Sequence, residues 1–493
     1  MATVSFSSPA SFAGDNSGAL TSATILRFPP NFVRQLSTKA RRNCSNIGVA
    51  QIVAAAWSDR RAVTSHSGGG SSVRGTSSHA AAASAATSAA AAAEVGAIPN
   101  AKLAQPSAAA LAERALLGSD ASLAVHAGER LGRRIATDAI TTPVVNTSAY
   151  WFSSSQELID FKEGRHASFE YGRYGNPTTE ALEKKMSALE KAESTVFVAS
   201  GMYASVAMLS TLVPAGGHIV TTTDLYRKTR IYMETELPKR GITMTVIRPA
   251  DMDALQDALD NNNVSLFFTE TPTNPFLRCI DIELVSNMCH NKGALLCIDS
   301  TFASPINQKA LTLGADIVVH SATKYIAGHN DVIGGCISGR DELVSKNASY
   351  LILRGMKTLH LRVQCQNSTA LRMAQFLEEH PKIAHVYYPG LPSHPEHHIA
   401  KSQMTGFGGV VSFEVDGDFD STRKFIDSVK IPYHAPSFGG CESIIDQPAI
   451  MSYWDSKEQR DIYGIKDNLI RFSIGVEDFE DLKNDIVQAL NKI

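Results

Sequence analysis

One lysine follows a short apolar run and is preceded by small hydroxyl residues. The run Ile317–Val319 predicts a buried strand, and Ser321, Thr323 and Lys324 come soon after it. In an open α/β sheet, residues beyond the carboxyl end of a strand line the crevice of the sheet. Burial there favours the neutral form of an amine, and a neutral amine is the nucleophile that forms a Schiff base. The alternative is a lysine at a strand end that faces solvent.

The hydroxyl groups beside this lysine indicate a phosphate-bearing aldehyde as its partner. Ser321 and Thr323 would hydrogen-bond a phosphate. Ser200-Gly201-Met202 follows another predicted strand and opens a helix, where backbone N–H groups bind phosphate. A turn that simply needs a glycine would have the same residues. Pyridoxal 5'-phosphate requires both an aldehyde trap and a phosphate site, so the pattern favours it as the cofactor.

Three further residues after predicted strands fit this cofactor, and each also fits an ordinary structural role. Asp299 ends a buried strand, where its carboxylate would pair with a protonated pyridine nitrogen or cap the next helix. Tyr226 would stack on the cofactor ring or pack in the core. Asn274 lies in a proline-rich turn and would bond the cofactor's phenolic oxygen or only form the turn.

The strands that must position these residues alternate with amphipathic segments such as 204–212 and 252–259, which indicates a mostly parallel α/β sheet. The predicted strands are Thr195–Val198, His218–Thr222, Thr243–Ile247, Val264–Phe268, Ala294–Ile298, Ala315–His320 and Ile333–Ser338. They predict one large domain, residues 176–372, with a seven-stranded sheet. Its first helix follows Asn176-Pro177, with Thr178 or Thr179 as the N-cap.

The pattern changes after about residue 372. Val410–Val415 alternates like a half-exposed strand, and 471–476 reads as another strand. Helices are predicted at 422–429 and 479–490. These elements predict a smaller α+β domain, residues 373–493, packed on the large one.

Residues 1–95 have the composition of a targeting segment rather than of a folded domain. Residues 1–93 hold eight Lys/Arg and two Asp, and serine and alanine are frequent. Such a composition is typical of an organelle transit peptide, and the hydroxyl-rich start favours the plastid over the mitochondrion. The Ala/Ser tract at 80–93 has no side chains with which to build a core, so a disordered linker is predicted. We therefore expect the protein in the chloroplast, in the plastid stroma.

Charge and composition exclude several other classes. The formal net charge is −3, and the leader carries +6, so the remainder carries −9. This balance gives no support for nucleic-acid binding, and no long run of core-forming apolar residues indicates a membrane span. The seven cysteines are scattered without C-x-x-C spacing, which predicts free thiols in a reducing compartment. His394, His397 and His398 surround Pro395, so we expect a surface loop there and no metal site.

Several segments together form a family pattern. They are Tyr171-Gly172-Arg173-x-x-Asn176-Pro177-Thr178, Ser200-Gly201-Met202, Asp299-Ser300-Thr301-Phe302, Ser321-Ala322-Thr323-Lys324-Tyr325-Ile326-x-Gly328-His329-x-Asp331-Val332, Ser437-x-Gly439-Gly440-x-Glu442-Ser443 and Arg471-x-Ser473-Ile474-Gly475-x-Glu477. This set resembles the signature of the Cys/Met-metabolism group of fold-type-I pyridoxal-phosphate enzymes. The likeness runs from about Asp120 to the C-terminus, with the segments in the expected order.

The resemblance implies roles for the matching residues. Lys324 would hold the cofactor covalently and shuttle protons, with Tyr226 as a second acid/base. The other cofactor-binding residues would be Asp299, Gly201, Met202, Ser321, Thr323 and Asn274, together with Tyr171 and Arg173 from the neighbouring subunit. Arg471 and Ser437 would bind the α-carboxylate of a small amino-acid substrate, because an arginine fork suits a carboxylate. The arm at 107–175 would then serve the neighbouring active site, which implies at least a homodimer, with a homotetramer expected.

Glu442, which we also place among the substrate-binding residues, resembles the γ-synthase and γ-lyase branches of the family. The chain departs from the common pattern in two places. Arg227-Lys228-Thr229-Arg230 stands where Gly-Gly is frequent, and Ser452-Tyr453-Trp454 stands where Thr-His is frequent. The first segment's basic side chains would bind a doubly charged phosphate of the substrate, or form a solvated loop.

Together with the plastid-like leader, these features imply a γ-replacement that joins O-phospho-L-homoserine and L-cysteine to give L-cystathionine and phosphate in methionine biosynthesis. The alternatives within the family are a cystathionine γ-lyase and an O-acylhomoserine sulfhydrylase. A cofactor-free scaffold with the same fold is the alternative from another class, and the intact Lys324, Asp299 and Arg471 argue against it.

Overall fold

The computed structural model describes residues 119–129, 139–339, 350–454 and 457–493. The predicted transit peptide, the linker and the first part of the predicted arm lie outside these residues. Within the described part of the chain, no helix is both long and apolar enough to cross a membrane.

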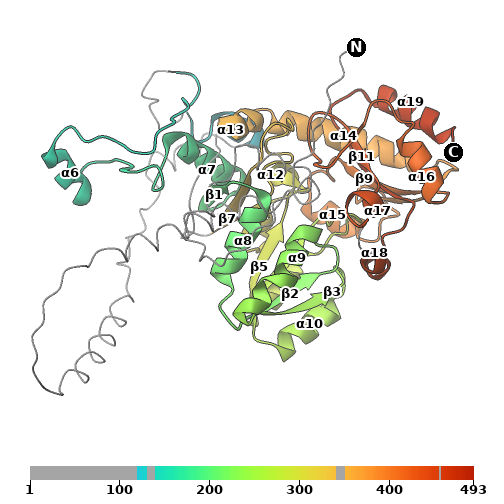
Figure 1. Ribbon diagram of the computed structural model, residues 1–493, viewed down its shortest axis with the longest axis horizontal. Helices are drawn as coiled ribbons and strands as arrows, with labels where there is room; N and C mark the ends of the chain where they lie inside the picture. The colour runs from blue at the N-terminus through green and yellow to red at the C-terminus, as the bar shows by residue number, and fades with distance from the viewer. Residues whose placement is uncertain (1–118, 130–138, 340–349, 455–456) are drawn as a thin grey trace, which may run out of the picture. The chain divides into compact units, whose positions relative to one another are not determined.

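A seven-stranded sheet forms the centre of the larger half of the described chain, as predicted (Figure 1). Its strands are β1 (Ser194–Val198), β2 (His218–Thr222), β3 (Thr243–Ile247), β4 (Val264–Glu270), β5 (Leu295–Asp299), β6 (Ile317–His320) and β7 (Gly335–Gly339). The order across the sheet is β1-β7-β6-β5-β4-β2-β3, and only β7 runs antiparallel to its neighbours. The carboxyl ends of the other six strands therefore meet at one edge of the sheet.

Helices bury both faces of this sheet because its strands are apolar on both sides. The helices are α7 (Pro177–Glu190), α8 (Gly201–Leu212), α9 (Arg227–Thr235), α10 (Met252–Asn261), α11 (Ile282–His290), α12 (Ser304–Asn307) and α13 (Tyr350–Met356), with 3₁₀ turns at Leu237–Arg240 and Ala310–Leu313. Helices α8 and α9 share one core with alternate residues of the strands. Helices α10 and α11 share a second core with the intervening strand residues.

The N-cap of α7 differs from the prediction. Asn176, not Thr178 or Thr179, is the cap, because its side-chain oxygen accepts hydrogen bonds from the backbone N–H groups of both threonines. Pro177 then occupies the first helical position, where a missing N–H is tolerated.

A second, five-stranded sheet follows in the chain, in the order β10-β11-β12-β9-β8 (orange to red in Figure 1). Its strands are β8 (Ile383–Tyr387), β9 (Val410–Val415), β10 (Tyr433–His434), β11 (Ile444–Asp446) and β12 (Leu469–Ser473). The helices of this region are α14 (Leu359–Glu378), α15 (His397–Gln403), α16 (Phe419–Ile426), α17 (Pro448–Met451), α18 (Lys457–Tyr463) and α19 (Phe479–Leu490). Helix α14 runs through the predicted limit at 372/373, and the division into domains stays a prediction.

The prediction of a half-exposed β9 is wrong, because every residue of this strand is buried. Its polar residues are buried together with partners. The Ser412 hydroxyl donates to the Pro275 carbonyl at 2.7 Å. The Glu414 carboxylate accepts a hydrogen bond from Tyr387 and pairs with Lys466, each at 2.7 Å. Alternation of polar and apolar residues therefore does not mark a solvent face here.

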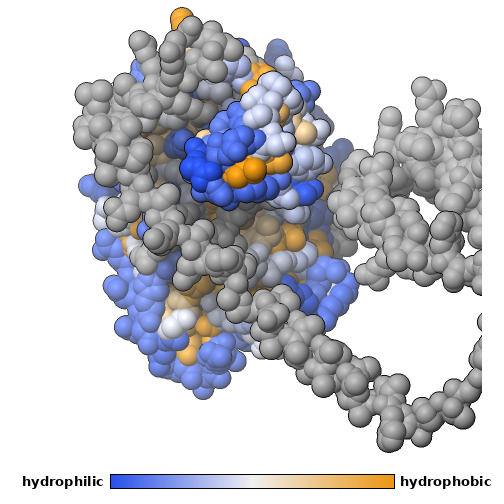
Figure 2. All heavy atoms as spheres, turned by 90° about the vertical axis from the view of Figure 1, so that its left-hand side faces the viewer, coloured by the Kyte–Doolittle hydropathy of each residue, from blue (hydrophilic) through white to orange (hydrophobic). Residues whose placement is uncertain are grey.

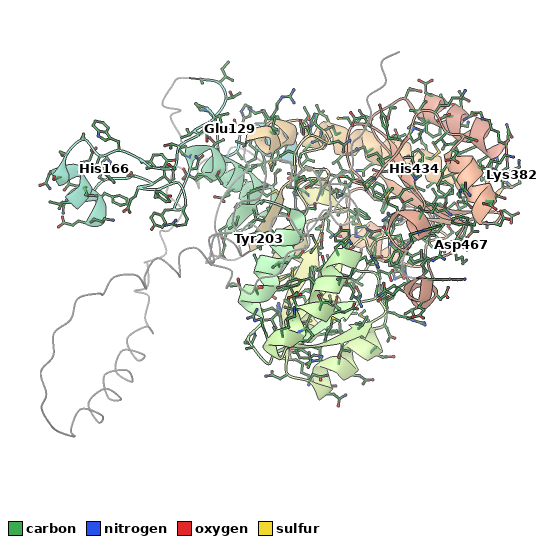
Figure 3. All side chains as sticks on the ribbon, viewed as in Figure 1. Glu129, His166, Tyr203, Lys382, His434 and Asp467 are labelled. Carbon is green, nitrogen blue, oxygen red and sulfur yellow. The ribbon has the colours of Figure 1, made fainter. Side chains whose placement is uncertain are left out.

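The described part of the N-terminal arm comprises α5 (Asp120–His126) and residues 139–175 with α6 (Ser155–Lys162). Figure 3 shows Glu129 next to α7 and His166 at the outer end of the arm. Large apolar side chains on the arm are exposed, with Ile140 at 90% and Trp151 at 84%. Figure 2 shows hydrophobic surface among hydrophilic residues on this side of the molecule.

A buried ion pair joins the arm to α7. Lys185 Nζ lies 2.6 Å from Glu129 Oε2, and both side chains are almost completely buried. Lys185 also donates to the Ala124 carbonyl of α5 at 3.0 Å. Lys357 lies 3.1 Å from the same carboxylate. Because a buried charge needs a partner, this contact fixes the base of the arm.

We expect Lys185→Ala to lower the free energy of unfolding by about 3–5 kcal/mol, because it leaves the Glu129 carboxylate buried with one cation fewer. Urea unfolding followed by circular dichroism measures the change. Lys184→Ala is the matched control, since Lys184 forms only an exposed ion pair with Glu180, and should change the free energy by about 0–1 kcal/mol. Equal effects of the two substitutions would contradict the role of the buried pair.

Candidate active site

The site lies where strands β2, β4, β5 and β6 end side by side. Asp299 is the last residue of β5, and Glu270 is the last residue of β4 directly opposite it in the ladder. Lys324 follows β6, and Tyr226 follows β2. The parallel order of the strands thus brings together residues that are up to about a hundred positions apart in the chain.

Lys324 is half-buried and faces the second sheet. Its Nζ donates a hydrogen bond to Ser437 Oγ at 3.2 Å. Burial lowers the pKa of the amine from 10.5 to about 8, and the positive charge of Arg471 adds to this shift. Asp446 and Asp299 oppose it. Ser437 has a φ of 84°, a strained value for a residue other than glycine, so the surrounding loop holds its hydroxyl at the lysine.

Asp299 carries its carboxylate into the site rather than capping a helix. Its Oδ1 accepts a hydrogen bond from the Thr301 N–H at 2.9 Å, and the next helix begins only at Ser304. Burial raises the pKa of Asp299, while hydrogen bonds from Thr301 and the charge of Lys324 lower it. A cationic partner at this position would therefore stabilise the ionised form.

Glu270 is a site residue that the sequence reasoning missed. Its Oε1 accepts the backbone N–H of Tyr226 at 2.5 Å. Burial and the neighbouring Asp299 raise the pKa of Glu270 well above its usual value. Two adjacent carboxyl groups in a buried site cannot both ionise easily. The predicted β4 ended at Phe268, so the acid at the true end of the strand went unnoticed.

The amino end of α8 lies against the chain that leads to Lys324. Ser200 caps the helix by accepting the Tyr203 N–H at 3.1 Å. A Cβ on Gly201 would lie 2.6 Å from Ser321 Cβ, so only glycine permits this approach. The first N–H groups of a helix have no partner within it, and here they belong to Gly201 and Met202 beside Ser321. This arrangement is suited to an anion such as a phosphate.

Thr323 bonds the chain on the far side of the loop that follows Lys324. Its backbone N–H and its hydroxyl both donate to the Gly334 carbonyl, at 3.2 and 3.1 Å. The hydroxyl also accepts the Gly334 N–H at 3.0 Å. Thr323 therefore supports the lysine loop, and the phosphate contacts of Thr323 and Ser321 stay predictions.

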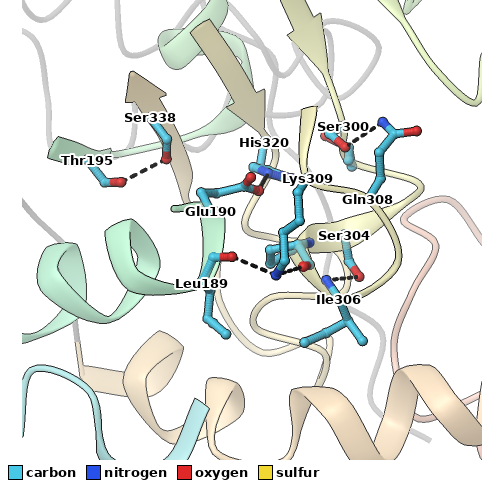
Figure 4. A network of polar contacts seen from close by, with 12 residues as sticks. Leu189, Glu190, Thr195, Ser300, Ser304, Ile306, Gln308, Lys309, His320 and Ser338 are labelled. Atoms are coloured by element: carbon cyan, nitrogen blue, oxygen red, sulfur yellow. Dashed lines mark hydrogen bonds and ion pairs between the residues drawn. The ribbon is translucent and has the colours of Figure 1, made fainter. Parts of the chain in front are cut away.

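A network of buried polar contacts fixes the chain just before Ser321 (Figure 4). His320 Nε2 lies 2.5 Å from Glu190 Oε1 at the end of α7, and both side chains are buried. Nearby, Gln308 donates to the Ser300 hydroxyl at 3.2 Å, just after Asp299. These contacts therefore fix the end of β5, which carries Asp299, and the end of β6, which leads to Lys324.

Arg471 comes from β12 and reaches the site from the second sheet. Asp446, its cross-strand neighbour on β11, accepts two hydrogen bonds from its guanidinium at 3.0 and 2.8 Å. Asn274 Oδ1 accepts a third at 2.7 Å. Asn274 therefore contacts Arg471, which a role in the turn alone does not explain. Its predicted contact with the cofactor's phenolic oxygen stays a prediction. Asp446 is a second residue that the sequence reasoning missed.

The three basic residues after Tyr226 differ in burial and in their contacts. Lys228 is exposed. Arg230 is buried and donates to the Thr222 carbonyl at the end of β2. The Arg227 guanidinium lies 5.4 Å from the centre of the Tyr453 ring and 3.5 Å from Gln459 Oε1. The alternative of a fully solvated loop is therefore wrong for Arg230.

Tyr226, Glu442, Tyr171 and Arg173 complete the predicted set. Tyr226 is 45% exposed, and burial near its hydroxyl raises its pKa, so the phenol stays protonated at neutral pH. Glu442 accepts a hydrogen bond from Asn330 at 2.8 Å. Arg173 lies over the Tyr171 ring at 4.8 Å on the arm. Within the described part of this single chain, no hydrogen bond joins these last three to Lys324.

The remaining residues offer no competing centre. In the described ranges, no group of three or more His, Cys, Asp or Glu residues is arranged to hold a metal ion. His394 is buried beside Glu396 rather than lying in the predicted surface loop. The six described cysteines are free, as predicted, and four of them are buried.

Comparison with known proteins identifies the family of the chain. A family model described as Cys/Met metabolism PLP-dependent enzyme matches residues 121–491. The chain belongs to this family. It is therefore an enzyme that depends on pyridoxal 5'-phosphate and acts on small amino-acid substrates.

Two relatives are similar over nearly the whole chain. Cystathionine gamma-synthase 1, chloroplastic, of Nicotiana tabacum is 65% identical over 492 residues, which cover 96% of this chain and 91% of that protein. The protein of the same name from Arabidopsis thaliana is 67% identical over 520 residues, with coverages of 98% and 91%. The crystal structure of metB from Corynebacterium glutamicum has a TM-score of 0.70 at 35% identity and covers 76% of this chain and 98% of that one.

The residues present fit the cofactor that the family requires. An amine with a pKa of about 8 suits covalent attachment of an aldehyde. Asp299 offers a carboxylate to a ring nitrogen, and the close approach of Gly201 to Ser321 leaves a backbone cradle suited to a phosphate. Lys324, Asp299 and the cradle therefore supply the three kinds of contact that this cofactor needs.

The lowered pKa of Lys324 predicts how fast its amine reacts with acetic anhydride in cofactor-stripped protein. The labelling rate should rise with pH and level off above a midpoint of about 8, because only the neutral amine reacts. Mass spectrometry of the peptide that contains Lys324 measures it. Arg471→Gln should raise the midpoint by removing a positive charge, and Asp299→Asn should lower it. A midpoint near 10.5 would refute the assignment.

Glu270 provides a test of how Tyr226 is positioned. Glu270→Ala removes the acceptor of the Tyr226 N–H and should lower the free energy of unfolding by about 1–3 kcal/mol. Glu270→Gln keeps an oxygen acceptor and should have a much smaller effect, because the wild-type carboxyl has a raised pKa. Thermal and urea unfolding compare the two. Equal losses would show that the hydrogen bond to Tyr226 is unimportant.

Proposed function

We propose that the chain catalyses a γ-replacement in methionine biosynthesis, as a cystathionine γ-synthase. It joins O-phospho-L-homoserine and L-cysteine to give L-cystathionine and phosphate. The observation that carries this proposal is the identity of 65% and 67% with plant cystathionine γ-synthases over nearly the whole chain. The basic helix start beside the lysine site supports phosphate, rather than an acyl group, as the leaving group.

Each site residue has a distinct task in this proposal. Pyridoxal 5'-phosphate, when bound, supplies an electron sink for negative charge that develops on the substrate. Lys324 holds the cofactor and then removes and returns protons of the substrate, since a pKa of about 8 lets it do both near neutral pH. Asp299 would pair with the cofactor's ring nitrogen. Tyr226 would lie against the ring and, as a protonated phenol, is suited to donate a proton.

The substrate is held at two ends. Arg471 and Ser437 bind the α-carboxylate, and Asp446 keeps the guanidinium oriented by its two hydrogen bonds. Arg227 and Lys228 face the leaving phosphate, whereas Arg230 supports them through its bond to the Thr222 carbonyl. Glu442 contributes from the loop that packs on the residues after Lys324.

The assembly in this proposal is a homo-oligomer. The arm at 107–175 reaches a neighbouring subunit, where Tyr171 and Arg173 complete the phosphate cradle. The exposed apolar side chains of the arm support this, because such residues are normally covered in an assembly. A dimer is the smallest unit that can share sites in this way, and a homotetramer is the expected form. The domains at 176–372 and 373–493 form each subunit.

The location in this proposal is the chloroplast. The leader at 1–95 has the composition of a plastid transit peptide. Both plant relatives that match nearly the whole chain are named chloroplastic. We therefore place the mature enzyme in the plastid stroma.

The decisive experiment measures phosphate release from O-phospho-L-homoserine with and without L-cysteine. We expect cysteine-dependent release with equimolar L-cystathionine. Lys324→Ala should abolish turnover, because it removes the amine that holds the cofactor and moves the substrate's protons. Turnover of cystathionine alone would indicate a γ-lyase, and preference for an O-acylhomoserine would indicate a sulfhydrylase. Retained activity of Lys324→Ala would refute the role of the lysine.

A further inference from the structure

The two places where the sequence departs from the common family pattern meet in space. The basic segment 227–230 opens α9, and Ser452-Tyr453-Trp454 follows α17 in the second half of the chain. The Arg227 guanidinium lies 5.4 Å from the centre of the Tyr453 ring. More than two hundred residues separate them in the sequence. Each of the two unusual segments therefore contributes one residue to the contact between Arg227 and Tyr453.

Tyr453 is built into the structure rather than lying loosely on it. Its side chain is 8% exposed and packs in a cluster with Ile465 and Leu469. Its ring also contacts Tyr463 edge-on, with centroids 6.4 Å apart. A ring fixed in this way offers one face to Arg227. Because an aromatic face attracts a guanidinium, it limits the positions that the arginine can take.

Tyr453 lies near both arginines to which the proposed function assigns the charged groups of the substrate. Its neighbour Ser452 contacts Arg471, which the proposed function assigns to the α-carboxylate, at 3.4 Å. Arg227, which the proposed function assigns to the leaving phosphate, lies over the Tyr453 ring itself. Both arginines are close enough to influence the phenol electrostatically. One segment thus touches the residues for both charged groups of the substrate.

Arg230, on the same helix, provides a comparison because its guanidinium makes different contacts. It also lies over a tyrosine, with its guanidinium 5.8 Å from the centre of the Tyr463 ring. However, it is buried and donates to the Thr222 carbonyl. Arg227 is half-buried, and its guanidinium donates to the side-chain oxygen of Gln459 on α18 at 3.5 Å. The two arginines therefore have different surroundings.

We infer that Tyr453 is a positioning residue that holds Arg227 for the leaving phosphate and so sets specificity for phosphate over acyl esters. The inference rests on the proposed function. A guanidinium kept over a ring is pre-oriented for two parallel hydrogen bonds to phosphate oxygens. An acyl ester has no such dianion and gains little from it. The effect of Tyr453 should consequently appear with one class of ester and not with the other.

The test compares kcat/KM for O-phospho-L-homoserine and O-acetyl-L-homoserine, each with L-cysteine. Tyr453→Ala should lower the phosphate-to-acetyl ratio about tenfold, which corresponds to about 1.4 kcal/mol. The loss should appear as a higher KM for the phosphate ester. The inhibition constant of inorganic phosphate should rise by a similar factor. Tyr453→Phe, which keeps the ring, should retain the wild-type ratio.

Two controls separate this role from a general loss of structure. Trp454→Ala removes an aromatic ring from the next position, one that is exposed and contacts Phe419, and should leave the ratio unchanged. Arg227→Gln should reproduce the ratio of Tyr453→Ala, and the double variant should add no further loss. Where Tyr453→Ala does not fold, Tyr453→Leu replaces it.

The outcomes are distinguishable. Equal losses for both esters, or additive effects of Arg227→Gln and Tyr453→Ala, would overturn the inference while leaving the proposed function intact. If the wild-type enzyme releases no phosphate from O-phospho-L-homoserine, the proposed function itself fails. A changed ratio with an unchanged Trp454→Ala control supports the assignment of Tyr453.

Discussion

The balance of charge around the Lys324 amine is the constraint on which the rest of the site depends. Burial lowers the pKa of the amine, and the nearby Arg471 shifts it in the same direction. Two carboxylates, Asp446 and Asp299, pull the pKa back toward its ordinary value. The result is an amine that can be neutral or charged near neutral pH. Such an amine suits a group that must first attack an aldehyde and later move protons.

The same balance explains why a second sheet is needed. Arg471 stands on β12 with Asp446 opposite it, so a cation enters the site already paired. An unpaired guanidinium at this depth would lose its hydration without compensation. The two hydrogen bonds that the guanidinium donates to Asp446 also fix the plane of the fork, which leaves its other edge for a carboxylate or for Asn274. The first sheet thus supplies the amine and Asp299, and the second supplies Asp446 and the arginine proposed as the substrate's anchor.

Around this centre, close approaches between distant segments shape the site. Gly201 lets the start of α8 touch Ser321. Glu270 ties the Tyr226 backbone to the end of β4, and the buried Glu190–His320 contact braces the end of β6. The ring of Tyr453 packs against the Arg227 guanidinium. Each of these contacts joins segments that are distant in the chain, so the site depends on the packing of the whole subunit.

The sequence alone determined the large sheet, whose apolar runs between amphipathic helices predicted all seven strands to within two residues. It also indicated Lys324, as an amine beyond the end of a buried strand, and Asp299, because an acid that ends a buried strand is costly without a partner. The role of Arg471 came from the resemblance to the family. Local pattern could not reveal Glu270 or Asp446, since their importance comes from neighbours on adjacent strands. Nor could it show that β9 is buried on both sides, or that Arg227 meets Tyr453 while Arg230 bonds a backbone carbonyl. Those facts depend on contacts between residues far apart in the chain, which only the tertiary structure decides.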